Sequence, residues 1–315
     1  MESRRDGPKT SSVSTLTRRS AMLLVGAGLA ASGAPWALAG GLGRRAIPGT
    51  GEAVPMVGLG TWQAFDTPAQ GAEYAAAADA LRAFLDRGGR LIDTSPMYGS
   101  AEARLGEMLG AVPTGKDAFI ATKVWTRGRE EGRRQLQESM RLLRRSTLDL
   151  VQVHNLLDFD VHWPMLQAAR DAGQVRYLGI THHQASAHAD LERVMRQARP
   201  AFVQVNYSLA EPEAAARLLP AARDLGVAVL VNRPFIKGAM IDRAQGKRLP
   251  PVADELGCRS AAQLFLKWVL GDPAVTVALA GTRNARHAVE NLEAAETPLP
   301  DARQRGAIES WYASL

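Results

Sequence analysis

The sequence predicts an α/β protein folded as one (β/α)8 TIM barrel behind a distinct N-terminal segment. Eight short runs rich in Val, Ile and Leu alternate with helix-patterned segments between residues 54 and 311. The runs are continuous in Val, Ile and Leu rather than alternating regularly with polar residues, which is typical of strands buried on both faces of a parallel sheet. Alternation of strand and helix implies parallel pairing, and eight units without a long interruption favour closure into a barrel.

The expected strands follow one another with room for a helix after each. A doubly wound open sheet is the alternative fold, but no Gly-x-Gly-x-x-Gly motif follows the first strand, so we favour the barrel. In chain order, the expected strands are Met56–Gly60, Arg90–Thr94, Ala118–Lys123, Leu148–His154, Val175–Thr181, Phe202–Tyr207, Val227–Val231 and Val275–Ala280.

The segments between strands carry apolar residues three and four positions apart, as one face of a helix does. Ser186 is expected to cap the helix after the fifth strand, and Gly88-Gly89 and Gly226 are expected to end helices before the next strand. The clearest helical segments are Ala72–Asp86, Ala101–Leu109, Arg129–Leu143, Leu191–Ala198, Glu213–Leu225 and Ala261–Leu270.

Residues 1–39 differ in composition from the rest of the chain. A polar, basic stretch ends in Arg18-Arg19, an apolar Gly/Ala-rich run covers Ala21–Ala34, and Ala37-Leu38-Ala39 follows. This order is typical of an export signal with an A-x-A cleavage site. The adjacent arginines resemble a twin-arginine signal, although Ala21 stands where that signal usually carries Phe. The alternative is an uncleaved membrane anchor, but the apolar run is short and interrupted by glycine for a stable span.

Cleavage after Ala39 divides the chain into a signal (1–39), a flexible lead-in (40–53) and the barrel (54–311). We expect the mature protein to be periplasmic or otherwise exported, with the twin-arginine machinery as its partner during export and no stable membrane span after cleavage. An uncleaved signal would instead leave the protein anchored to the membrane.

Composition argues against several functions. The net charge of +6 is spread over scattered Arg pairs, and no aromatic-interleaved basic stripe indicates a nucleic-acid partner. The single cysteine, Cys258, excludes an intramolecular disulfide and any multi-cysteine metal site. His182 and His183 are adjacent, so on a strand they would point to opposite faces, and no suitably spaced carboxylate or thiol accompanies them. We therefore expect no metal.

Four reactive side chains stand where three consecutive expected strands end. Asp93 and Tyr98 follow the second strand, Lys123 closes the third and His154 closes the fourth. The C-terminal ends of barrel strands meet at one face, where such barrels carry their catalytic residues. Each residue alone also has an ordinary structural interpretation, such as a satisfied buried histidine. Their placement at one end of one barrel favours a shared site.

Together these residues suit reduction of a carbonyl by hydride transfer, which leaves an alkoxide that must receive a proton. A tyrosine hydroxyl is a suitable donor if its pKa falls from about 10 toward the working pH, and the ammonium of Lys123 would lower that pKa. Asp93 would keep Lys123 charged, and His154 would donate to the carbonyl oxygen or polarise Tyr98. A different chemistry, a Schiff base on Lys123 in a lyase or isomerase, leaves Tyr98 without a clear role.

Four segments stand in a recognisable order: Gly58-Leu59-Gly60-Thr61-Trp62, the Asp93–Glu102 segment with its Asp-Thr-x-x-x-Tyr-Gly pattern, Thr122-Lys123 and His154-Asn155. In order and context these segments resemble the aldo-keto reductases. The resemblance extends from about Val54 to Asn291. It implies that Tyr98 is the acid, that Lys123 and Asp93 tune it, and that His154 orients the carbonyl of a small aldehyde or ketone.

The resemblance also implies residues that hold a nicotinamide cofactor. Thr181 keeps the hydroxyl of the family's Gly-x-Ser-Asn segment, whereas His182 replaces its amide. Asn232 replaces the aromatic residue that stacks on the nicotinamide, and this is the largest departure. The residues implied at this end are Gly60, Thr61, Trp62, Asp93, Thr181, His182, Gln204, Asn232, Arg233, Pro234 and Phe235.

The last strand runs into the segment that the resemblance assigns to phosphates and adenine. Gly281 stands where the family commonly has lysine, and Arg283 and Arg286 are available for a 2′-phosphate. A helix beginning near Asn284 would add its N-terminal amides. We therefore expect NADP(H), with NAD(H) as the alternative. The implied contacts are Gly281, Thr282, Arg283, His287, Glu290 and Asn291.

Two questions stay open in the sequence. Asn232 leaves room for a second function, a nicotinamide-binding regulatory or interaction barrel with little or no turnover. Trp125, Phe159 and Trp163 follow the third and fourth strands and would wall a substrate pocket, but Trp163 equally fits the buried face of a helix.

Overall fold

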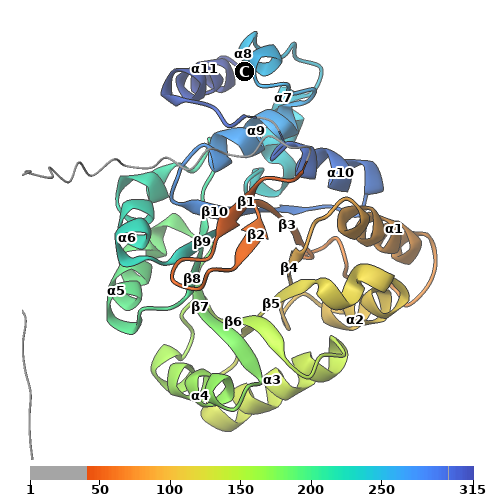
Figure 1. The fold of residues 1–315 in the computed structure, drawn as a ribbon, viewed down its shortest axis with the longest axis vertical. Coiled ribbons are helices and arrows are strands. Elements are labelled where there is room, and N and C mark those ends of the chain that lie inside the picture. The colour runs from red at the N-terminus through yellow and green to blue at the C-terminus, as the bar shows by residue number, and fades with distance from the viewer. Residues whose placement is uncertain (1–40, 297) are drawn as a thin grey trace, which may run out of the picture. The chain divides into compact units, whose positions relative to one another are not determined.

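The computed structural model describes residues 41–296 and 298–315, so the expected signal and its cleavage site lie outside the described residues. From residue 57 onward, eight parallel strands close into a barrel in the order β10-β3-β4-β5-β6-β7-β8-β9 (Figure 1). This confirms the (β/α)8 fold and excludes the open doubly wound sheet.

Each barrel strand lies within one residue of its predicted bounds at either end. The register brings the C-terminal parts of neighbouring strands together, as in the pairs Gly60 with Asp93, His154 with Thr181 and Thr181 with Gln204. The strands are β3 (Val57–Gly60), β4 (Leu91–Asp93), β5 (Phe119–Val124), β6 (Leu148–His154), β7 (Val175–Thr181), β8 (Phe202–Asn206), β9 (Ala228–Asn232) and β10 (Val275–Gly281).

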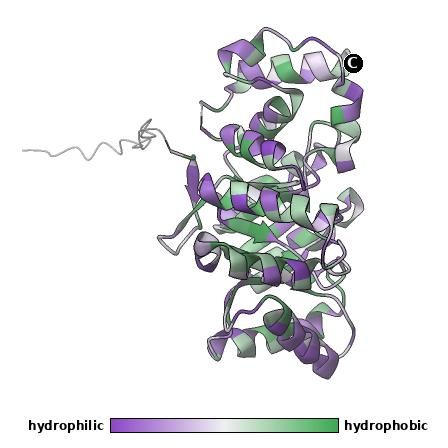
Figure 2. Ribbon diagram, turned by 90° about the vertical axis from the view of Figure 1, so that its right-hand side faces the viewer, coloured by the Kyte–Doolittle hydropathy of each residue, from purple (hydrophilic) through white to green (hydrophobic). Residues whose placement is uncertain are grey.

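Helices surround the barrel and cover the outer faces of its strands. They carry both apolar and polar side chains, whereas the strands at the centre are mainly apolar (Figure 2). The α-helices are α1 (Ala72–Asp86), α2 (Ala101–Ala111), α3 (Arg129–Leu142), α4 (Phe159–Asp171), α5 (His188–Ala198), α6 (Leu218–Leu225), α7 (Ala239–Ala244), α8 (Val252–Glu255), α9 (Ala261–Leu270), α10 (Ala285–Glu293) and α11 (Ala302–Ala313). Short 3-10 turns are η1 (Pro113–Asp117), η2 (Ala185–Ala187), η3 (Glu213–Ala216) and η4 (Ile236–Gly238).

The predicted helix ends are only partly correct. Gly226 adopts a left-handed conformation (φ +65°) directly after α6, as a C-terminal glycine does. The prediction for Ser186 is wrong, because Ser186 lies inside the turn η2 and the residue that precedes α5 is Ala187. The 3-10 turn begins at Ala185, before the apolar pattern of the helix starts. The hydroxyl of Ser186 therefore does not stand at the N-terminal cap of α5.

A β-hairpin occupies the segment predicted as a flexible lead-in (40–53), and that prediction is corrected for the described residues. Strands β1 (Arg44–Ala46) and β2 (Ala53–Pro55) pair antiparallel. Ile47 and Val54 are buried with residues from the first half of the barrel strands, so the hairpin covers the N-terminal end of the barrel (Figure 1). Arg45 fixes it by donating hydrogen bonds to the carbonyls of Leu270 (2.6 Å) and Asp272 (3.0 Å).

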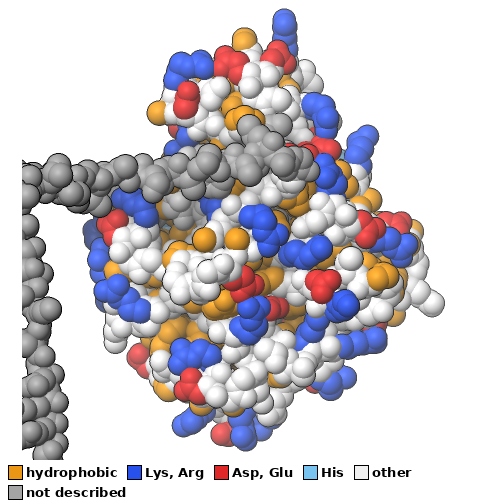
Figure 3. All heavy atoms as spheres, viewed as in Figure 1, with side chains coloured by type: hydrophobic (Ala, Val, Ile, Leu, Met, Phe, Trp, Pro, Cys, Tyr) orange, Lys and Arg blue, Asp and Glu red, His pale blue; other side chains and the backbone are white. Residues whose placement is uncertain are grey.

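The surface around the hairpin shows basic and acidic side chains interspersed, without one continuous basic area on this face (Figure 3). Among the helices of residues 41–296 and 298–315, none combines the length and the apolar character of a membrane span. The same residues contain no cluster of three or more His, Cys, Asp or Glu side chains placed to hold a metal ion.

Candidate active site

The C-terminal ends of the strands open into a cavity of about 930 Å³. Asp93, Tyr98 and His154 line it at one end, and Arg283 and the first turns of α10 line it at the other. The predicted residues in the lining are Gly60, Thr61, Trp62, Asp93, Tyr98, His154, Thr181, Gln204, Asn232, Arg233, Pro234, Phe235, Gly281, Thr282, Arg283, His287, Glu290 and Asn291.

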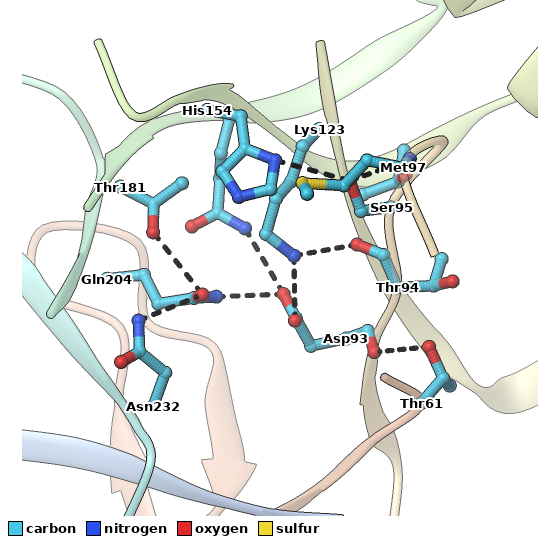
Figure 4. Close-up of polar contacts among 12 residues, drawn as sticks. Thr61, Asp93, Thr94, Ser95, Met97, Lys123, His154, Thr181, Gln204 and Asn232 are labelled. Atoms are coloured by element: carbon cyan, nitrogen blue, oxygen red, sulfur yellow. Dashed lines mark hydrogen bonds and ion pairs between the residues drawn. The ribbon is translucent and has the colours of Figure 1, made fainter. Parts of the chain in front are cut away.

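Asp93 is the centre of the polar network beneath this cavity. Its Oδ2 lies 2.7 Å from Nζ of Lys123, and its Oδ1 accepts hydrogen bonds from the amides of Gln204 (2.8 Å) and Gln152 (3.3 Å) (Figure 4). The backbone oxygen of Asp93 also accepts from the hydroxyl of Thr61 at 3.0 Å. Side chains from three other strands, β5, β6 and β8, therefore hold this carboxylate in place.

Lys123 does not line the cavity but lies directly beneath it, 1% exposed. Burial by itself lowers the pKa of Lys123, but the charge of Asp93, followed by Tyr98, outweighs burial and raises that pKa above its ordinary value. Its Nζ also donates to the backbone oxygen of Thr94 at 2.7 Å. Lys123 is thus a held ammonium, which does not fit a Schiff-base nucleophile, because that chemistry needs a neutral amine.

Tyr98 lies beside this ammonium, with Nζ of Lys123 4.8 Å from the centre of its ring. Burial raises the pKa of Tyr98, Lys123 lowers it in part, and the charge of Asp93 raises it again. The expected influence of Lys123 is present, but burial outweighs it, so the net shift is upward rather than downward. The hydroxyl therefore keeps its proton at neutral pH, which is the form an acid needs.

His154 completes the group at the end of β6. Its ring meets that of Tyr98 edge to face, with centroids 6.3 Å apart. Burial, followed by the positive charge of Lys123, lowers the pKa of His154 to about 2. The imidazole is therefore neutral and can donate one hydrogen bond from one ring nitrogen. The structure brings all four predicted catalytic residues together.

The other end of the cavity is lined by the loop after β10 and by residues of α10. Asn284 caps α10, and its side-chain oxygen accepts from the backbone N–H of Arg286 (3.0 Å) and His287 (3.3 Å). A Cβ on Gly281 would lie 3.2 Å from the backbone oxygen of Gly60, so the two loops approach closely here. Arg283 lines the cavity, whereas Arg286 faces a separate hollow beside α1.

Comparison with known proteins shows to which protein family this arrangement of residues belongs. A profile described as "Aldo/keto reductase family" matches residues 56–310. The chain belongs to the aldo/keto reductase family. It is 24% identical over 280 residues to the aldo-keto reductase YhdN of Bacillus subtilis, covering 75% of this chain and 84% of that protein. It is 27% identical over 258 residues to the methylglyoxal reductase YeaE of Escherichia coli, covering 79% and 88% of the two chains.

Solved structures of the family share the fold. An aldo-keto reductase from Klebsiella pneumoniae, solved with NADPH, superposes with a TM-score of 0.70 at 24% identity, covering 86% of this chain and 95% of that one. A glycerol dehydrogenase from Gluconobacter oxydans gives a TM-score of 0.71 at 23% identity, with the same coverage of 86% and 95%.

The residues that depart from the aldo/keto reductase pattern take distinct positions. Asn232 lines the cavity and donates from its amide to Gln204 Oε1 at 3.4 Å. His182 is absent from the lining, and His183 lies there instead. The two histidine rings stack nearly parallel at 5.4 Å instead of pointing to opposite faces, because β7 ends at Thr181 and both residues belong to the loop beyond it.

The three bulky residues after β5 and β6 separate into two groups. Trp125 is 40% exposed and its ring lies 6.3 Å from that of His154, but it does not belong to the cavity lining. Phe159 and Trp163 stack on each other at 5.3 Å in α4, and neither lines the cavity. For Trp163, the buried helix face is therefore the correct interpretation.

Sequence reasoning missed some of the site. Gln152 is a polar residue in the middle of a buried strand, which was a usable signal for a role in the network. Ser95 lies at an unspecified position of the Asp-Thr-x-x-x-Tyr-Gly pattern, so the pattern gives it no role. The remaining lining residues that were not predicted lie mostly in loops and in α7, and include Gln63, Ala64, Met97, Asn155, His183, Lys237, Ile241, Asp242 and Ser260.

Proposed function

We propose that this protein reduces a small aldehyde or ketone to the corresponding alcohol, with NADP(H) as the redox cofactor. The observation that carries the proposal is the buried Lys123–Asp93 ion pair at 2.7 Å directly beneath Tyr98 at the cavity. The ammonium of this pair can stabilise the anion that Tyr98 becomes when it gives up its proton.

The residues fit the cofactor in two ways. The cavity is long enough to be lined by the catalytic group at one end and by α10 at the other. Thr181 and Asn232 both donate to Gln204 Oε1, at 3.3 and 3.4 Å, and so form a polar floor suited to a carboxamide. When bound, NADPH supplies the hydride. Thr181, Gln204 and Asn232 would face its nicotinamide end, and Arg283 would face its 2′-phosphate.

The protein's part of the reaction is proton delivery and charge stabilisation. His154 donates a hydrogen bond to the carbonyl oxygen and places it near the hydroxyl of Tyr98. Tyr98 then gives its proton to the alkoxide oxygen. The resulting phenolate lies beside the ammonium of Lys123, which stabilises it, and Asp93 keeps that ammonium charged and oriented.

NADP(H) is favoured over NAD(H) because Arg283 lines the nucleotide end of the cavity, and because the Klebsiella relative was solved with NADPH. A positive guanidinium matches a 2′-phosphate and gains little from a ribose hydroxyl. Comparing the dissociation constants of NADPH and NADH by quenching of tryptophan fluorescence tests this choice.

Oxidation of NADPH, followed by its absorbance with a panel of small aldehydes and ketones, tests the reaction. We expect turnover that is lost in Tyr98→Phe while NADPH still binds. The second candidate function, a regulatory barrel with little turnover, is favoured only by the loss of the stacking aromatic at Asn232. NADPH binding without turnover of any carbonyl would refute the reductase proposal and support that candidate.

We infer further that residues 1–39 direct export by the twin-arginine machinery and are removed after Ala39. The support is the sequence alone: Arg18-Arg19, the apolar run and the small residues before Gly40. Cell fractionation with N-terminal sequencing tests both statements. Retention of Arg18→Lys/Arg19→Lys protein in the cytoplasm is expected, and a native chain that keeps residue 1 and stays in the cytoplasm would contradict export.

A periplasmic reductase would also need its cofactor. We expect the barrel to fold around NADP(H) before export, because the twin-arginine route carries folded proteins. Protein purified from the periplasm should then contain nucleotide, and its absence would count against this order of events.

A further inference from the structure

Ser95 follows β4 and is wholly buried beside the catalytic group. Its hydroxyl oxygen lies 3.3 Å from Nδ1 of His154, and it also accepts a hydrogen bond from the backbone N–H of Met97 at 3.4 Å (Figure 4). Within residues 41–296 and 298–315 these are its two hydrogen-bond partners. The proton-transfer steps described above do not use this hydroxyl.

The two partners determine the direction of the hydroxyl proton. A backbone N–H can only donate, so Met97 occupies a lone pair of Ser95 Oγ and leaves its proton to be placed elsewhere. Nδ1 of His154 is the acceptor within reach. If Nδ1 carried a proton instead, the buried hydroxyl of Ser95 would have no acceptor in the described chain, which is unfavourable.

We propose that Ser95 is a positioning residue that holds neutral His154 in the tautomer with its proton on Nε2. Figure 4 shows Nδ1 directed at Ser95 and the second ring nitrogen directed away from it. Nε2 has no hydrogen-bond partner within the described residues and is not enclosed by protein atoms, and His154 lines the cavity. The Nε2–H group is thus aimed at bound substrate.

The tautomer matters for the reaction because a carbonyl oxygen accepts hydrogen bonds. Nε2–H donates to this oxygen, whereas the opposite tautomer would present a lone pair to it and repel it. The ring is also neutral throughout the physiological range, since burial and then Lys123 lower the pKa of His154 to about 2. Fixing this tautomer therefore allows neutral His154 to donate a hydrogen bond to the carbonyl oxygen. This consequence rests on the proposed reductase function, but the tautomer itself does not.

Nitrogen-15 NMR of the histidine rings in the full chain measures the tautomer directly. The signal of His154 is assigned by its loss in His154→Gln. We expect a single Nε2–H form in the parent and an appreciable share of Nδ1–H in Ser95→Ala, with Ser95→Thr restoring the parent spectrum because it keeps the hydroxyl. Thr94→Val is the matched control: it removes a neighbouring buried hydroxyl that has no hydrogen-bond partner among the described residues, so the tautomer of His154 should not change.

Kinetics separate positioning from a general structural defect. In Ser95→Ala, kcat/KM should fall roughly 2- to 10-fold, the effect of losing one neutral hydrogen bond, while the NADPH dissociation constant stays unchanged. If Ser95→Ala does not fold, Ser95→Cys replaces it, because a thiol is a weak donor of similar shape.

The outcomes distinguish this inference from the function on which part of it rests. A pure Nε2–H form in Ser95→Ala, or in Ser95→Cys where it replaces an unfolded Ser95→Ala, would overturn the role of Ser95, whether or not the enzyme reduces carbonyls. A changed tautomer in these variants, in a parent that turns over no carbonyl, would uphold the role of Ser95 and refute the reductase proposal.

Discussion

Replacing Lys123 with Met removes the buried charge on which the site depends while keeping an unbranched side chain of similar length. Removing one partner of a buried ion pair typically costs about 3–5 kcal/mol, because the remaining charge is left without compensation. Here Asp93 would keep Gln204 at 2.8 Å and Gln152 at 3.3 Å as donors, so we expect the lower end, about 3 kcal/mol. At about 2–4 °C per kcal/mol for a domain of this size, Tm should fall by about 6–12 °C.

The same variant changes the pH dependence of stability. The pKa of Lys123 is raised in the folded protein above its ordinary value of 10.5. A raised lysine pKa stabilises the fold below the unfolded value, and that stability is lost as the pH rises through the folded value. The parent should therefore lose stability above about pH 10.5, and Lys123→Met should lack this part of the alkaline loss.

Thermal unfolding at neutral and alkaline pH, together with kcat for a good aldehyde substrate, checks these expectations. The kcat should fall about 100-fold or more, because the Tyr98 phenolate loses its neighbouring cation. Lys116→Met, which removes an exposed lysine, is the matched control and should change neither quantity. A Lys123→Met protein with the Tm and kcat of the parent would refute the role given to the buried pair.

Two further predictions concern the two ends of the cavity. Because the pKa of His154 is lowered to about 2, the pH profile of kcat/KM should show no ionisation of His154 between pH 5 and 8, and stability should fall as the pH drops below the ordinary histidine value of 6.5; NMR titration showing His154 protonated near pH 6 would contradict this. Arg283→Ala should weaken NADPH binding roughly tenfold or more and change NADH binding little, measured by fluorescence quenching. Equal losses for the two nucleotides would show that Arg283 does not contact the 2′-phosphate.

The barrel was predictable because its strands are buried on both faces, so their sequences are rich in Val, Ile and Leu and do not alternate regularly with polar residues. The catalytic group followed from that, since residues at the C-terminal ends of neighbouring strands must meet. Lys123 is the penultimate residue of β5 and His154 is the last residue of β6, so the convergence of their side chains can be expected without any knowledge of the loops.

What escaped prediction depends on tertiary contacts. The strands of the β1–β2 hairpin are three residues each, and Arg44-Arg45 reads as solvent-exposed until the carbonyls that Arg45 bonds are known. His182 and His183 were assigned strand geometry, although they lie one and two residues past the end of β7. The upward shift of the pKa of Tyr98 could not be predicted from the sequence either, because it depends on how deeply the ring is buried.

The most direct test of the central claim is single-turnover reduction of an aldehyde by NADPH-loaded protein, compared between the parent and Tyr98→Phe. The account predicts oxidation of bound NADPH in the parent and a loss of at least about 100-fold in the variant, with the NADPH dissociation constant unchanged. Equal rates in the two proteins would contradict the assignment of Tyr98 as the proton donor.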